Sequence, residues 1–199
     1  MSELLSEQLK QLTKRNHQQL EKLLIPHLRS VSTNKEYIQL LQIFYGFFGA
    51  LEEKIKYYVG KEQLPDFTER RKTESIANDI QIMGGTIPEK AKGTDLPQIK
   101  NHLQALGALY VIEGSTLGGK IISQMMVKQL NLPDNKGVSF FSGYGADTER
   151  MWNSFKKILD NQYKNSAEAD LIVKTANDTF LQFKLWIEKM SGEMNFLSS

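Results

Sequence analysis

Apolar side chains recur at three- and four-residue intervals along most of this chain, and this spacing constrains the fold more than any other feature. The first segment carries a stripe at helical spacing, made of Leu5, Leu9, Leu12, Leu20 and Leu24. Pro26 is expected to end that helix. Strand-like alternation, internal repeats and low-complexity linkers are absent from the sequence. We therefore expect one all-α domain over residues 1–199, with about seven or eight helices.

Later helices are predicted from the same spacing and from capping residues. Thr33 and Glu36 have the spacing of a capping box, which opens a helix through residue 55. Further helices are expected at about 68–83, from Pro97 into a glycine-rich segment, then over 117–130, 148–163 and 165–190, the last one capped by residues 165–168. The segment Phe140–Gly145 is expected to be an aromatic loop.

Composition excludes several functions. The net charge of +2 over 199 residues indicates neither a nucleic-acid track nor a polybasic membrane anchor. Cysteine is absent, which excludes disulfides, thiolate metal sites and a cysteine nucleophile. The first residues do not resemble a signal peptide, and no apolar run approaches the ~20 residues that span a bilayer. We expect a soluble cytoplasmic protein.

The segment Gly114–Lys120 carries three glycines within six residues, which is costly in a regular helix. It almost matches a phosphate-binding loop, but Ile121 stands where that loop needs a hydroxyl, and strand–helix alternation is missing. Close packing of two helices would also explain the glycines. The third interpretation is a bent helix whose backbone and Ser115 lie over a planar ligand.

His17 lies at the edge of the first apolar stripe and is a candidate metal ligand. Glu21 follows four residues later and is placed to orient the imidazole, while Lys10 lies two turns earlier on the same flank. This arrangement suits an anionic, amphipathic ligand with a metal at its centre. A di-iron carboxylate bundle is excluded because no histidine follows a glutamate by three residues. His27 and His102 are expected to be structural or solvated.

Two segments together resemble the heme oxygenase family, in the bacterial branch associated with phytochromes. Residues 13–21, TKRNHQQLE, resemble the family's proximal helix, and residues 106–119, LGALYVIEGSTLGG, resemble its distal helix. Residues 141–145, followed by Met151, Trp152 and Phe155, are also similar to that branch. The resemblance spans most of the chain in the family's order.

The resemblance implies a multi-helix bundle that holds heme between the first helix and a glycine-kinked distal helix. It implies oxidative opening of heme to biliverdin, with release of carbon monoxide and ferrous iron, driven by O₂ and an electron donor such as ferredoxin or a flavin reductase. His17 carries over as the ligand of the heme iron, and Ser115 and Gly114 as catalytic residues. The other residues implied to bind heme are Lys10, Glu21, Tyr110, Gly118, Gly119, Lys156, Phe180 and Phe183.

Ser115 departs from the family pattern, because many members carry an aspartate there to organise proton delivery. A serine hydroxyl holds a water molecule but relays protons poorly by itself. Glu113 lies two residues earlier and points elsewhere on a regular helix. The alternatives are a non-catalytic heme-binding or heme-storage protein on the same fold, and a helical interaction domain without heme. A phytochrome pathway downstream is a further expectation.

Overall fold

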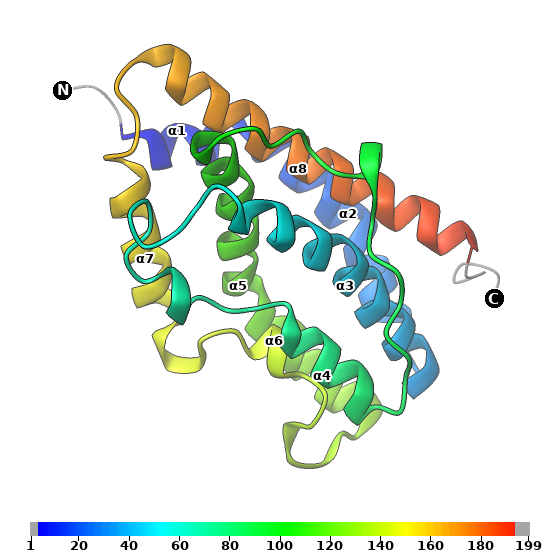
Figure 1. Ribbon diagram of the computed structural model, residues 1–199. Coiled ribbons are helices and arrows are strands. Elements are labelled where there is room, and N and C mark those ends of the chain that lie inside the picture. The colour runs from blue at the N-terminus through cyan, green and yellow to red at the C-terminus, as the bar shows by residue number, and fades with distance from the viewer. Residues whose placement is uncertain (1–3, 194–199) are drawn as a thin grey trace.

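The computed structural model describes residues 4–193, which form eight α-helices (Figure 1). They are α1 (Leu5–Leu12), α2 (Lys14–Ser30), α3 (Asn34–Lys56), α4 (Glu74–Ile82), α5 (His102–Leu130), α6 (Ser139–Ser142), α7 (Thr148–Leu159) and α8 (Ser166–Glu193). No strand occurs over this range. The all-α prediction is therefore confirmed for the described residues.

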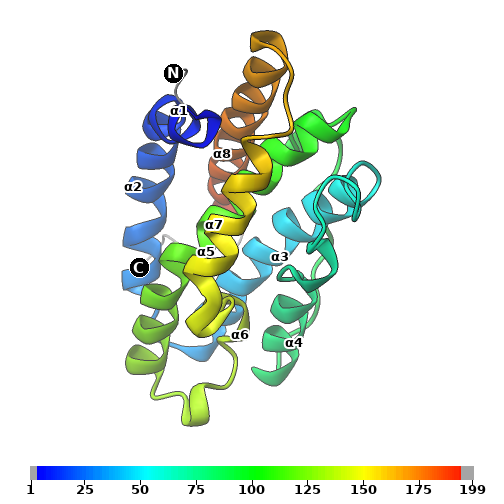
Figure 2. The same ribbon diagram turned by 90° about the vertical axis from the view of Figure 1, so that its left-hand side faces the viewer.

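Two long helices, α5 and α8, organise the packing. They lie against each other, and α2 packs along α8 while α3, α6 and α7 pack on α5. Figure 2 shows α2 at one side of the bundle and α4 at the other, with α5, α7 and α8 between them. Helices α2 and α5 therefore share α8 as a common support.

The core is one cluster of buried side chains that draws on all eight helices, from Leu5 to Ile187. Its centre is aromatic: the Phe183 ring lies 4.9 Å from Phe47 and 4.7 Å from Phe48, between centroids. The Phe44 ring lies 5.2 Å from the Phe183 ring and 5.2 Å from the Phe141 ring, between centroids. Aromatic side chains bury more apolar area than other residues, so these rings contribute strongly to the stability of the bundle.

The first predicted helix differs from the structure by an internal break and by its end. It is broken at Thr13, whose hydroxyl donates to the Leu9 carbonyl at 2.6 Å, and this splits it into α1 and α2. Pro26 does not end α2, which continues to Ser30. The last turn compensates for the missing proline N–H through tertiary contacts, since His27 and Leu28 are buried there. His27 is thus a helical core residue.

Two other helices begin later than expected. The predicted helix over 68–83 is confined to Glu74–Ile82, and residues 70–73 form a non-helical segment. Helix α5 begins at His102 and not near Pro97, because Asn101 caps it by accepting a hydrogen bond from the Gln104 N–H at 3.0 Å. The glycines do not interrupt α5, which is helical from His102 to Leu130.

Two capping predictions are confirmed, and one loop prediction is wrong. Thr33 and Glu36 form the capping box of α3, with Glu36 N–H donating to Thr33 Oγ1 at 3.2 Å and Thr33 N–H to Glu36 Oε2 at 2.9 Å. Asn165 caps α8 by accepting from the Glu168 N–H at 3.0 Å. The expected aromatic loop is instead the short helix α6 followed by a turn at Gly143. No helix within residues 4–193 is long and apolar enough to cross a membrane.

Candidate functional site

His17 is held at the surface of the bundle by the packing of α2 on α8. Its ring centroid lies 5.3 Å from that of Phe180, and half of its side chain is exposed (51%). Asn16 donates to Asn177 Oδ1 at 2.7 Å, which fixes this turn of α2 to α8. Glu21 Oε1 lies 3.7 Å from His17 Nε2, too far for a hydrogen bond. The imidazole thus packs against the Phe180 ring, and half of the His17 side chain is accessible to solvent.

Helices α2 and α5 run in the same general direction (Figure 2), and two hydrogen bonds join α5 to the residues that flank α2. At one end, Tyr110 shares a hydrogen bond with Thr13. At the other end, Gln129 Nε2 donates to the Val31 carbonyl at 2.6 Å. One turn beyond the first contact, α2 carries His17 and α5 carries Gly114. His17 and the glycine segment thus both lie between these two contacts along their helices.

The α5 surface between these contacts is apolar and exposed. A Cβ placed on Gly118 would meet nothing within 4 Å. Leu117 and Ile121, its neighbours on the helix, are 46% and 65% exposed. Large exposed apolar side chains next to an open glycine are typical of a surface that a ligand covers. We refer to Leu117, Gly118 and Ile121 as the open face of α5.

The three glycines of the segment have different surroundings. Gly119 is buried against α6, where an added Cβ would overlap the carbonyl oxygen of Phe141. Its lack of a side chain is explained by helix packing, one of the alternatives that the sequence left open. At Gly114, a Cβ would make an ordinary contact with Trp152 at 3.6 Å. Gly118 alone among the three opens onto free space.

Ser115 lies at the edge of the open face with its hydroxyl already engaged. Its Oγ–H donates to the Ile112 carbonyl at 2.6 Å, and its oxygen accepts from Arg71 Nη2 at 2.8 Å. Because a hydroxyl has one proton, that proton is committed to the helix backbone. In this geometry Ser115 presents an acceptor, and not a donor, to anything else.

Glu113 lies on the opposite flank of α5 from Ser115 and belongs to a buried polar network. It pairs with Arg70 at 2.8 Å, both side chains being 1% exposed, and it accepts from the Tyr144 hydroxyl at 2.9 Å. Arg70 also pairs with Asp66 at 2.6 Å. Burial, together with the charge of Glu113, raises the pKa of Tyr144 far above its ordinary value, so the phenol stays protonated.

Sequence analysis did not find Arg70, Arg71 or Tyr144. Both arginines fall inside the predicted helix over 68–83, where their side chains would have been taken for a solvated surface. Tyr144 falls in the predicted aromatic loop. No local pattern marks these residues, because their partners on α5 lie at least 31 positions away along the chain, and only the Arg70–Asp66 pair is local.

The remaining predicted residues lie at varied distances from this opening. Lys10 is exposed on α1, and Lys156 on α7 places its Nζ 5.8 Å from the centre of the Trp152 ring, which lies 5.3 Å from Tyr110. Tyr110 shares a hydrogen bond with Thr13, one turn before His17, and the Phe180 ring contacts the His17 ring. Phe183 is 2% exposed within the aromatic core, so the structure assigns it to core packing.

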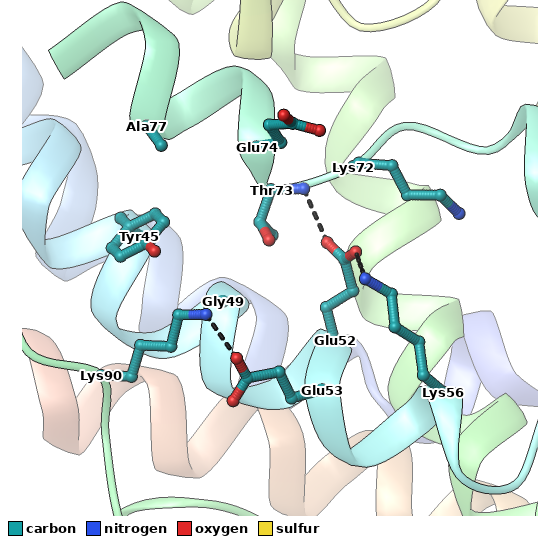
Figure 3. Close-up of a pocket in the computed structure, with 10 residues that line it drawn as sticks. All are labelled: Tyr45, Gly49, Glu52, Glu53, Lys56, Lys72, Thr73, Glu74, Ala77 and Lys90. Carbon is teal, nitrogen blue, oxygen red and sulfur yellow. Dashed lines mark hydrogen bonds and ion pairs between the residues drawn. The ribbon is translucent and has the colours of Figure 1, made fainter. Parts of the chain in front are cut away.

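A separate pocket of about 300 Å³ lies between α3, α4 and Lys90 (Figure 3). Four of its charged residues are paired: Glu52 accepts from Lys56 and also from the Thr73 N–H, both at 2.6 Å, and Lys90 pairs with Glu53 at 2.6 Å. Burial alone raises the pKa of Glu52, but these hydrogen bonds hold it below its ordinary value of 4.5. The Glu52–Thr73 hydrogen bond holds the start of α4 against α3, and no residue of α2 or α5 lines this pocket.

A helical bundle that sets one half-exposed imidazole beside an open, glycine-bearing helix face defines a class of helical proteins that hold a flat, metal-bearing ligand between two helices. Comparison with known proteins identifies the family. The family model of heme oxygenase matches residues 3–189, so the chain belongs to the heme oxygenase family.

Individual relatives are similar over most of their length. A heme oxygenase from Guillardia theta is 24% identical, covering 90% of this chain and 83% of its own. Heme oxygenase 1 from Synechocystis is 23% identical, covering 98% and 88%. Among solved structures, the Neisseria meningitidis heme oxygenase bound to NO and CO has a TM-score of 0.84 at 19% identity, covering 96% of this chain and 94% of its own. Synechocystis heme oxygenase 1 in complex with heme has a TM-score of 0.75 at 20% identity, covering 98% and 95%.

Proposed function

We propose that this protein is a heme oxygenase that opens heme to biliverdin and releases carbon monoxide and ferrous iron. The observation that carries the proposal is that the half-exposed imidazole of His17 and the open face of α5 lie between the same two interhelical hydrogen bonds. Membership of the heme oxygenase family supports the same activity.

The residues present fit a heme by their chemistry. A neutral imidazole is a common iron ligand, and His17 is the histidine whose ring borders the opening. Gly118 leaves room for a porphyrin plane to approach the α5 backbone, and Leu117 and Ile121 offer apolar contact. Lys10 and Lys156 are the cations proposed for the propionates, and Phe180 supports the ligating ring.

Bound heme would supply both the substrate and the iron that reacts with O₂. The chain would ligate the iron through His17 and shield the reacting face with Gly114 and Gly118. Ser115 would hold a water molecule through its free acceptor position, since its own proton is bonded to Ile112. This role replaces the direct proton donation that an acidic residue at this position would offer.

Several further assignments belong to the same proposal. One core cluster joins all eight helices, which supports a single domain for the whole chain. Glu21 is proposed to orient His17, and Tyr110 to close the end of the site on Thr13. An electron donor such as ferredoxin or a flavin reductase, a cytoplasmic location and a downstream phytochrome pathway complete the proposal.

Hemin titration followed by turnover tests this function. Adding hemin is expected to give a shifted Soret band, and His17→Ala should change the spectrum and weaken binding. His102→Ala, which alters an exposed histidine at the start of α5, is the matched control and should behave as the unaltered protein. An unshifted Soret band, or the same spectrum in His17→Ala, would contradict the role of His17.

Reductant then separates the enzyme from a storage protein on the same fold. With ascorbate or a ferredoxin system, the Soret band should decay while biliverdin absorbance rises. A hemin complex that stays intact under these conditions would favour the non-catalytic alternative.

A further inference from the structure

Arg71 joins three separate parts of the protein beside Ser115. Its Nη1 donates to the Phe140 carbonyl at 3.1 Å, and its Nη2 donates to the Ile112 carbonyl at 2.9 Å and to Ser115 Oγ. Its guanidinium lies 4.0 Å from the centre of the Phe140 ring. One side chain thus ties the segment before α4 to both α5 and α6.

The guanidinium group of Arg71 has different partners from that of Arg70. Arg70 pairs with two carboxylates, Asp66 and Glu113, whereas no ion pair joins Arg71 to a carboxylate within residues 4–193. Its acceptors are neutral carbonyls and a hydroxyl. Desolvation lowers the pKa of Arg71 to about 10, while Glu113 opposes this shift, so the guanidinium remains charged at neutral pH.

Position around α5 decides which charge the open face senses. At ~100° per residue, Ser115 lies about 60° from Gly118 on one flank of the open face, while Glu113 lies about 40° from Leu117 on the other flank. Arg71 reaches Ser115, and the Glu113 carboxylate is neutralised by Arg70. Among the described residues on these two flanks, the charge that no ion pair compensates is therefore the positive charge of Arg71.

We propose that Arg71 is a positioning residue for the distal side of the heme, which fixes Ser115 as an acceptor and makes the bound iron favour anionic over neutral ligands opposite His17. This inference rests on the proposed function, because it requires hemin to bind against the open face. A fixed guanidinium acts through the field at the iron and needs no direct contact with the ligand.

Ligand titration of the ferric hemin complex tests the inference without turnover. Azide provides the anionic probe and imidazole the neutral one, each followed by the Soret shift. Arg71→Met and Arg71→Gln should both weaken azide binding by about tenfold, as expected for loss of a unit charge about 12 Å from the anion at an effective dielectric near 20. Imidazole binding should change by less than about twofold, since a neutral ligand senses the charge weakly.

Three further variants separate charge from geometry. Arg71→Lys and Ser115→Ala keep a cation in place and should retain the azide preference. Arg150→Met removes a cation from the exposed face of α7, where it pairs with Asp147 at 2.8 Å, and serves as the matched control. Arg71→Gln keeps hydrogen-bond donors on the side chain, so its azide and imidazole affinities provide the test if Arg71→Met does not fold.

The outcomes are distinct. If azide and imidazole weaken equally in the charge-removing variants, Arg71 only shapes the site and the proposal is wrong. If Ser115→Ala loses the azide preference as fully as Arg71→Gln, the preference belongs to the hydroxyl, which also overturns it. Hemin that does not bind to the unaltered protein would refute the proposed function itself, which the Soret band reports before any ligand is added.

Discussion

Adjacent glycines in α5 should respond in opposite ways to the same substitution. Gly119→Ala places a methyl group on the carbonyl oxygen of Phe141, whereas Gly118→Ala places it where nothing lies within 4 Å. The two variants are matched in chemistry and separated by one residue. They therefore isolate the effect of tertiary surroundings from that of helix propensity.

The magnitudes follow from two opposing effects. Replacing glycine by alanine inside a helix stabilises it by about 1 kcal/mol. At Gly119, overpacking against backbone costs about 3 kcal/mol, the upper end for core insertions, because a carbonyl in α6 cannot rotate away. Gly119→Ala should thus lower the free energy of unfolding by about 2 kcal/mol. Gly118→Ala should raise it by about 1 kcal/mol.

Urea and thermal denaturation of both apo variants measure these changes in stability, and hemin titration then measures the affinity for hemin. A protein of this size shifts its Tm by about 2–4 °C per kcal/mol, so Gly119→Ala should melt about 4–8 °C lower. Gly118→Ala should melt slightly higher but bind hemin about tenfold more weakly, since its methyl group enters the open face and opposes close approach of the porphyrin. Equal destabilisation in both variants, or unchanged hemin affinity in Gly118→Ala, would refute the reasoning.

Two further changes test the polar interior. Glu113→Gln leaves Arg70 with one carboxylate in place of two, and it should lower the free energy of unfolding by about 3 kcal/mol in urea; a loss below about 1 kcal/mol would argue against a tightly buried pair. The second concerns Glu52, whose pKa is lower in the folded than in the unfolded protein, so its stabilisation is present above about pH 4.5 and is lost as the pH falls through its folded pKa. Glu52→Gln should therefore flatten that part of the acid-unfolding curve, and an unchanged curve would contradict the role of Glu52 in holding α4.

Local patterns in the sequence predicted most of the helices, because their signals are carried by neighbouring residues. The capping box of α3 and the cap of α8 formed as expected, since each needs only a side chain and an N–H three residues away. Boundaries that depend on distant contacts were wrong. Pro26 stays within α2 because packing on α8 compensates for a lost hydrogen bond.

The candidate site divides in the same way. His17 and the glycine segment were visible in the sequence as residue types at telling positions, and the resemblance to heme oxygenases rests on them. Which glycine is open and which is packed was not visible, because Gly118 and Gly119 are chemically identical and differ only in what lies opposite. The roles expected for His17 and Ser115 stay predictions until hemin is titrated.

The sequence alone determined the all-helical class, the positions of most helices and the candidate histidine, because periodicity and capping act over one or two turns. Only the tertiary structure decided what surrounds each of these residues. It brought Arg71 to Ser115 across 44 positions, buried Glu113 against Arg70, and left Gly118 open while closing Gly119 on α6. Such contacts depend on how whole helices cross, and that is fixed by the packing of a shared core and not by any short stretch of chain.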